Sequence, residues 1–79
     1  MTFLIVDDNS EMRRLIKSVV TKASDIAYEC SDGKDALVSY ERSQPDWVLM
    51  DIKMPGVDGI SATRQIKEAF PQAKIIVVS

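Results

Sequence analysis

Residues 47–59 read WVLMDIKMPGVDG, and this stretch decides the fold. Its first four residues are apolar, which is typical of a strand buried on both faces of a sheet. Asp51 follows them directly, and residues 53–59 must form a loop because they hold one proline and two glycines. The stretch therefore predicts a buried strand that delivers one carboxylate to the start of a loop.

Three more strands are predicted around this stretch. Residues 3–6 and 75–78 are apolar throughout, which indicates strands that belong inside the sheet. Residues 26–30 alternate between the two faces, which favours a half-buried edge strand. The core-facing residues of that edge strand would be Ile26, Tyr28 and Cys30.

Three amphipathic helices are predicted between the strands. The first covers residues 10–23, with Asn9 or Ser10 as its N-cap. Its apolar face would comprise Met12, Leu15, Ile16, Val19, Val20 and Ala23. The second helix would turn Ala36, Leu37 and Tyr40 inward, before Pro45. The third would carry Ile60, Thr63, Ile66 and Phe70, and Pro71 would end it.

Strands that alternate with helices pair in parallel through right-handed crossovers. We therefore expect one α/β domain, an open flavodoxin-like sheet with three helices and the strand order 2-1-3-4. The strand at 26–30 would then lie at an edge, and the strands at 3–6 and 47–50 would be neighbours.

The amino-acid composition excludes several classes of function. The 79 residues carry a net charge of −2, which argues against a nucleic-acid-binding surface, and they include no histidine and one cysteine. Serine–histidine catalysis, histidine metal sites and an internal disulfide are thereby excluded. No apolar run approaches the roughly 20 residues that span a bilayer, so we expect a cytoplasmic protein without a membrane partner.

Polar residues follow three of the predicted strands. Asp7 and Asp8 come after the first strand, Asp51 after the third and Ser79 after the fourth. Parallel strands end at the same edge of a sheet, so the carboxylates would meet in the crevice where open α/β sheets bind ligands. Two carboxylates ~4 Å apart repel by about 4 kcal/mol at an effective dielectric near 20. Such a cluster favours a hard cation, Mg²⁺ or Mn²⁺.

The same residues also admit other interpretations. One acidic residue alone would more simply cap a helix, but three at converging strand ends favour a site. A haloacid-dehalogenase-type phosphohydrolase needs Asp-x-Asp, whereas residues 51–53 read DIK, and a P-loop motif does not occur. Arg13, Arg14 and Lys17 form a basic strip on the first helix, either solvated or in contact with a partner.

Together these residues resemble the receiver domains of two-component response regulators. The Asp7-Asp8 pair is similar to the acidic pair of that family. Asp51, with Lys53-Met54-Pro55-Gly56 and Asp58-Gly59 behind it, is similar to the phosphoacceptor strand and its loop. Ser79, 28 residues after Asp51, is similar to the switch serine or threonine.

The resemblance implies a role for each residue. Asp51 would accept a phosphoryl group from a sensor histidine kinase or phosphotransfer protein. Asp8 and Asp51 would bind Mg²⁺ directly, the backbone carbonyl of Lys53 would be a further ligand, and Asp7 would act through a water. The Ser79 hydroxyl would turn toward the phosphoryl group. The chain would be a signalling module and not an enzyme.

The resemblance also implies that residues 1–79 are a partial receiver domain. Members of the family continue for roughly another third of their length, including a fifth strand with a lysine that contacts the phosphoryl group. We therefore expect impaired phosphate acceptance. The alternative is a chemically silent interaction or assembly fragment. In either case the apolar strand 75–78 would favour a homo-oligomer.

Overall fold

Four parallel strands form one sheet in the computed structural model, which describes residues 1–78. The strands are β1 Thr2–Val6, β2 Ile26–Cys30, β3 Trp47–Asp51 and β4 Ile75–Val78, and their order is β2-β1-β3-β4. The helices are α1 Ser10–Val20, α2 Ala36–Ser43 and α3 Gly59–Ala69. The predicted flavodoxin-like order, the parallel pairing and the number of helices among the described residues are confirmed.

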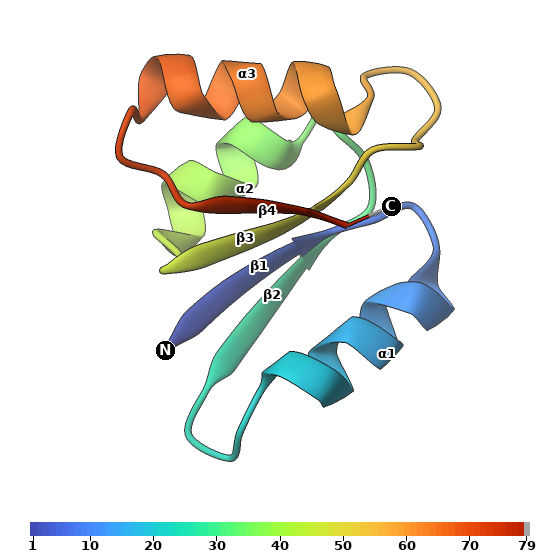
Figure 1. Ribbon diagram of the computed structural model, residues 1–79, viewed down its shortest axis with the longest axis vertical. Helices are drawn as coiled ribbons and strands as arrows, with labels where there is room; N and C mark the ends of the chain where they lie inside the picture. Colours follow the sequence, from blue (N-terminus) through green and yellow to red (C-terminus); the bar gives the residue numbers. More distant parts are fainter. Residues whose placement is uncertain (79) are drawn as a thin grey trace.

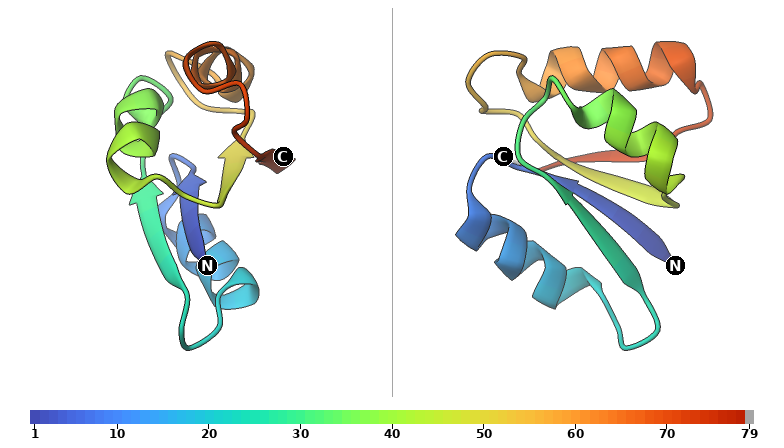
Figure 2. Two further views of the ribbon diagram at one scale, coloured as in Figure 1. Left: turned by 90° about the vertical axis from the view of Figure 1, so that its left-hand side faces the viewer. Right: turned by 180° about the vertical axis from the view of Figure 1, so that it is seen from behind.

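The helices lie on both faces of the sheet (Figures 1 and 2). Helices α2 and α3 cover one face and enclose the larger core, whereas α1 covers the other. Eleven buried residues form the larger core: Leu4, Val6, Cys30, Ala36, Tyr40, Val48, Met50, Met54, Ala62, Ile66 and Ala73. Beneath α1, a smaller core of Phe3, Ile5 and Leu49 packs against Ile16 and Val20.

Helix α1 is shorter than predicted. It begins after Asn9, whose side chain accepts a 3.0 Å hydrogen bond from the Met12 N–H, so Asn9 is the cap. It ends at Val20, because Thr21 is extended and its N–H closes the last turn on the Lys17 carbonyl. Ala23, predicted on the apolar face, lies outside the helix.

Only part of the predicted apolar face of α1 packs against the sheet. Met12 is 42%, Leu15 56% and Val19 74% exposed, and only Ile16 and Val20 pack on the sheet. The physical reason is geometric, since among residues 1–78 α1 is the one helix on its face and its width cannot cover four strands. A groove remains, lined by Leu15, Ile16, Val19, Val20, Leu49 and Val78.

The two outer strands lie at the edges of the sheet, as the predicted order requires, and both are partly exposed. In β2, Cys30 is buried, but Ile26 and Tyr28 are about half exposed because no described strand lies beyond them. Strand β4 is apolar throughout, which is typical of a strand inside a sheet, but the predicted order 2-1-3-4 places it last. It lies at the other edge, and Ile76 and Val77 are each 46% exposed.

The loop between β3 and α3 is anchored in the larger core. Met54 is buried there, and Val57 packs against the same residues. Gly56 has a φ of +78°, a conformation that glycine adopts without steric cost. The loop therefore leaves the end of β3 along a defined path. Within residues 1–78 no helix is both long and apolar enough to cross a membrane.

Candidate functional site

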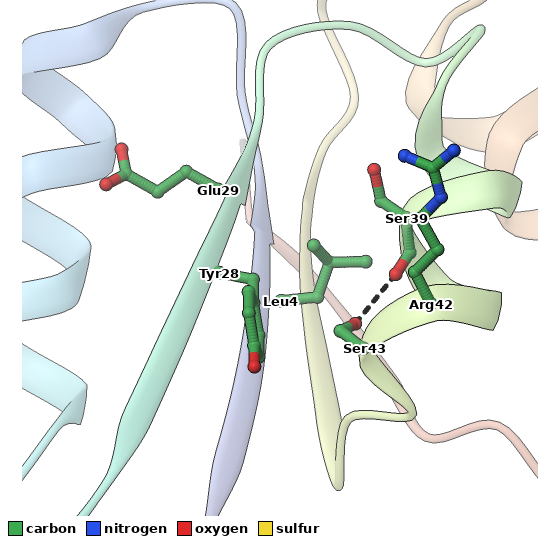
Figure 3. Close-up of a pocket in the computed structure, with 6 residues that line it drawn as sticks. All are labelled: Leu4, Tyr28, Glu29, Ser39, Arg42 and Ser43. Atoms are coloured by element: carbon green, nitrogen blue, oxygen red, sulfur yellow. Dashed lines mark hydrogen bonds between the residues drawn. The ribbon is translucent and has the colours of Figure 1, made fainter.

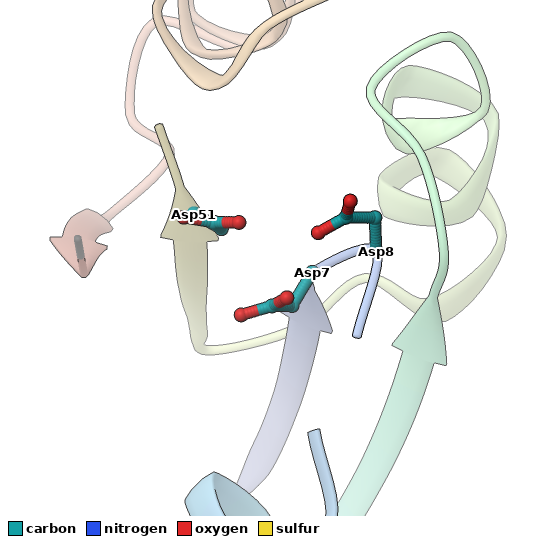
Figure 4. Close-up of side chains that lie close together, drawn as sticks. All are labelled: Asp7, Asp8 and Asp51. Atoms are coloured by element: carbon teal, nitrogen blue, oxygen red, sulfur yellow. The ribbon is translucent and has the colours of Figure 1, made fainter. Parts of the chain in front are cut away.

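Three carboxylates gather where β1 and β3 end (Figure 4). Asp7 and Asp8 follow β1, and Asp51 is the last residue of β3. One oxygen from each carboxylate lies within 4.8 Å of the others. The predicted convergence of these three carboxylates is therefore present in the structure.

Strand register brings the carboxylates together. β1 and β3 are parallel neighbours, and Val6 lies opposite Met50. The next residue on each strand is an aspartate, so Asp7 and Asp51 emerge side by side. A shift of one residue would send these side chains to opposite faces, and the buried apolar pairs of the two strands prevent it.

Backbone N–H groups hold two of the carboxylates. Asp7 is buried, and its Oδ1 accepts a 2.9 Å hydrogen bond from the Asn9 N–H. Asp51 Oδ1 accepts a 3.2 Å hydrogen bond from the Lys53 N–H. Asp8 is exposed, so its position depends on the backbone that carries it.

The cluster carries uncompensated negative charge. Burial raises the pKa of the Asp7 carboxyl above its usual value of 3.8, and the nearby Asp51 and Asp8 carboxylates raise it further. The Asn9 N–H opposes this rise in pKa. The two ion pairs of the described chain, Met1–Asp25 and Arg13–Glu29, do not include a carboxylate of the cluster. A hard divalent cation with oxygen ligands fits this donor set.

The predictions for Lys53, Ser79 and Cys30 are tested by the structure to different extents. The Lys53 N–H binds the Asp51 carboxylate, and the Lys53 side chain is exposed; the role of its carbonyl as a metal ligand stays a prediction. Ser79 lies outside the described residues, so its switch role also stays a prediction. Cys30 is buried, as expected for a small core residue.

Arg13 is the residue that sequence reasoning missed. It was placed with Arg14 and Lys17 on a solvated or partner-binding strip, but its side chain is only 16% exposed. Its Nη1 donates a 2.7 Å hydrogen bond to the Asp7 carbonyl, and its Nε donates a 2.9 Å hydrogen bond to Glu29. Three segments of the chain meet in these contacts, so no local pattern in the sequence predicts them.

Comparison with known proteins agrees with the geometry. The model of the response regulator receiver domain family matches residues 3–79. Chemotaxis protein CheY of Thermotoga maritima is 46% identical over 77 residues, which are 96% of this chain and 64% of that protein. CheY of Bacillus subtilis is 43% identical over the same shares of the two chains. The chain thus spans just under two thirds of the length of these curated relatives.

Solved structures share the fold. The response regulator domain of Thermotoga maritima CheB has a TM-score of 0.91 and 31% identity, covering 100% of this chain and 60% of that one. Response regulator TrrA of the same organism, solved in complex with Mg²⁺ and BeF, has a TM-score of 0.89 and 30% identity. That match covers 96% of this chain and 66% of that one.

Proposed function

The chain belongs to the response regulator receiver domain family, and on that premise we propose that it accepts a phosphoryl group on Asp51. One observation carries the proposal: three carboxylates from two strand ends lie within 4.8 Å of one another, with Asp51 at the tip of β3. The donor would be a sensor histidine kinase or a phosphotransfer protein in the cytoplasm. The chain would act stoichiometrically in signalling and not as an enzyme.

The same carboxylates suit Mg²⁺ or Mn²⁺. Asp8 and Asp51 would bind the ion directly, Asp7 would hold one of its waters, and the Lys53 carbonyl would complete the protein ligands. The ion would offset negative charge on the phosphoryl oxygens as they approach the cluster. TrrA, which shares the fold, was solved with Mg²⁺ and BeF.

Phosphate acceptance is a substitution at phosphorus. An Asp51 carboxylate oxygen forms the new P–O bond while the bond between phosphorus and the donor's imidazole nitrogen breaks, and the freed imidazole takes up a proton. The Lys53 N–H holds Asp51 Oδ1, which orients the carboxylate for this attack. The Ser79 hydroxyl would donate a hydrogen bond to a phosphoryl oxygen.

We expect the 79-residue chain to accept phosphate slowly when it is tested alone. In the family, a lysine on a later strand contributes charge to the phosphoryl group. Loss of one such electrostatic contact typically costs about 10²–10³ in rate, by analogy with oxyanion-hole donors. A rate equal to that of a full receiver domain would contradict this expectation.

A small-molecule acyl phosphate tests the proposal without a kinase. The chain is incubated with the donor and Mg²⁺, and its intact mass is followed over time. We expect a Mg²⁺-dependent phosphoryl adduct in the wild type and in Asp58→Asn, a control at an exposed carboxylate near the site. Asp51→Asn should give no adduct, and an adduct of equal yield in that variant would refute the proposal.

A second candidate function is an interaction between copies of the chain. The groove beside α1 is lined by apolar residues only, and it continues to β4, the open edge of the described sheet. Ile76 and Val77 are each 46% exposed there, and β4 contains no proline or lysine that would block pairing with another strand. We propose that a second copy of the chain covers this surface.

A further inference from the structure

Arg13 connects the acidic site to β2, a strand that contributes no carboxylate to the cluster. It lies in the first turns of α1, and its guanidinium group binds two acceptors at once. One is the backbone carbonyl of Asp7, at 2.7 Å from Nη1. The other is the carboxylate of Glu29 on β2, at 2.9 Å from Nε.

Strand register explains why Glu29 is available to Arg13. Glu29 lies opposite Ile5 of β1, on the face of the sheet that α1 covers. Figure 3 shows its side chain leaving β2 toward α1. The neighbouring residue Tyr28 lies opposite Leu4 of the larger core, on the other face of the sheet. Glu29 therefore holds the guanidinium of Arg13 from the β2 side while Arg13 reaches the end of β1.

The contact with the Asp7 carbonyl fixes the peptide that joins Asp7 to Asp8. The Asp7 N–H is already held by the Cys30 carbonyl at 3.0 Å. With the carbonyl bound as well, the Asp7–Asp8 peptide has a defined orientation, and Asp8 starts from a defined position. The Asp8 carboxylate is exposed and points toward Asp51, and the backbone that carries it sets the position from which it does so.

We propose that Arg13 is a positioning residue for the metal site, acting through the Asp7 carbonyl to place the Asp8 carboxylate. This inference rests on the proposed function, since it concerns the Mg²⁺ site suggested there. Substitution of a group that orients a metal ligand typically lowers metal affinity about 10–100-fold.

The direction in which Mg²⁺ affinity changes distinguishes a positioning role of Arg13 from a simple effect of its charge. A guanidinium bound to the Asp7 carbonyl, beside the metal site, would repel a divalent cation, so removing its charge alone would tighten Mg²⁺ binding. Loss of positioning would weaken it. Arg13→Ala therefore tests two mechanisms that predict opposite changes, and Arg13→Lys keeps the charge while losing the fork that binds both acceptors.

The experiment compares Arg13→Ala, Arg13→Lys and Arg14→Ala with the wild type and with Asp8→Asn. Arg14 is the exposed neighbour of Arg13 on α1, so its substitution removes the same charge without the contacts to Asp7 and Glu29. Mg²⁺ is titrated while the backbone amide resonances are followed by NMR, and circular dichroism checks the fold. We expect about tenfold weaker binding in both Arg13 variants and a change of less than about twofold in Arg14→Ala.

Unchanged or tighter binding in Arg13→Ala would overturn the inference, as would wild-type affinity in Arg13→Lys. If Arg13→Ala does not fold, Arg13→Lys decides. The proposed Mg²⁺ site itself fails if the wild type and Asp8→Asn respond alike. In that case the metal-free spectra still test positioning, because the Asp8 amide resonance should move in Arg13→Lys and stay in place in Arg14→Ala. An unmoved Asp8 resonance in Arg13→Lys would refute it.

Discussion

Gly59 lies directly against the backbone carbonyl of Asp51. A Cβ at position 59 would overlap the Asp51 oxygen and would also crowd the backbone of Ile52. The Gly59 N–H donates a 3.1 Å hydrogen bond to the Ile52 carbonyl. The first residue of α3 is thus packed on the end of β3, and this contact helps to set where the Asp51 carboxylate lies.

Gly59→Ala is expected to destabilise the fold. Alanine favours a helix over glycine by about 1 kcal/mol. The overlap involves backbone atoms that cannot rotate away, and overpacking of this kind costs about 1–3 kcal/mol. The steric cost should therefore exceed the gain in helix propensity. We expect the free energy of unfolding, measured with urea, to fall by up to about 2 kcal/mol.

Gly56→Ala is the matched control for Gly59→Ala. A Cβ there meets no atom within 4 Å, so its cost comes only from the positive φ, about 1–2 kcal/mol. Both variants should lose stability, but only Gly59→Ala should shift the amide resonances of Asp51 and Ile52. Equal shifts in the two variants would show that the close contact does not determine the position of β3.

Asp7→Asn should stabilise the metal-free protein at neutral pH. Because the folded pKa of Asp7 is raised, the folded state holds this proton more tightly than the unfolded state. The resulting stability is fully present below the usual pKa of 3.8 and is lost as pH rises through the folded pKa. The side-chain amide of asparagine stays neutral, so the variant does not lose this stability as pH rises. Its oxygen can still accept a hydrogen bond from the Asn9 N–H.

Urea unfolding with a chelator, repeated across pH, measures this difference. The free energy of unfolding of Asp7→Asn should exceed that of the wild type at neutral pH, and the gap should close in acid. Asp58→Asn should behave oppositely, because the Ser61 N–H lowers the pKa of Asp58 and its stabilisation appears above 3.8. If the difference in free energy of unfolding between Asp7→Asn and the wild type does not depend on pH, the pKa of Asp7 is not raised in the folded protein.

The alternation of apolar strands and amphipathic helices was sufficient to predict the parallel sheet and its order. The carboxylate cluster was predictable too, because Asp7 and Asp51 each follow a buried strand directly and register follows from burial. The exposure of Leu15 and Val19 was not predictable, since helical periodicity identifies an apolar face but does not say how much of it the sheet can cover. Arg13 was missed because its partners depend on the register of β2.

Self-association is predicted to depend on the edge strand β4. Ile76 and Val77 are each 46% exposed, so burying the rest of each side chain could gain about 0.7–1.4 kcal/mol, which matters beside the small total stability of such a domain. We expect a dimer or larger assembly at micromolar concentration, measured by light scattering after size exclusion. Ile76→Lys should shift it toward monomer, because lysine at an edge opposes strand pairing.

Val38→Lys is the matched control for Ile76→Lys. Val38 is 49% exposed, close to the 46% of Ile76, but it lies on α2, away from β4. Its substitution should leave the association unchanged. A wild-type chain that elutes as a folded monomer, or equal effects of the two lysines, would refute self-association through β4.

The position of the phosphoryl group tests the central claim most directly. After incubation with the acyl phosphate donor and Mg²⁺, borohydride converts an aspartyl phosphate to homoserine, which peptide sequencing by mass spectrometry locates in the chain. The measurement distinguishes Asp51 from Asp7 and Asp8, although their carboxylates lie within 4.8 Å of one another. We predict homoserine at position 51 only; homoserine at position 7 or 8, or none in a chain that carries the adduct, would contradict the assignment of Asp51 as the phosphoacceptor.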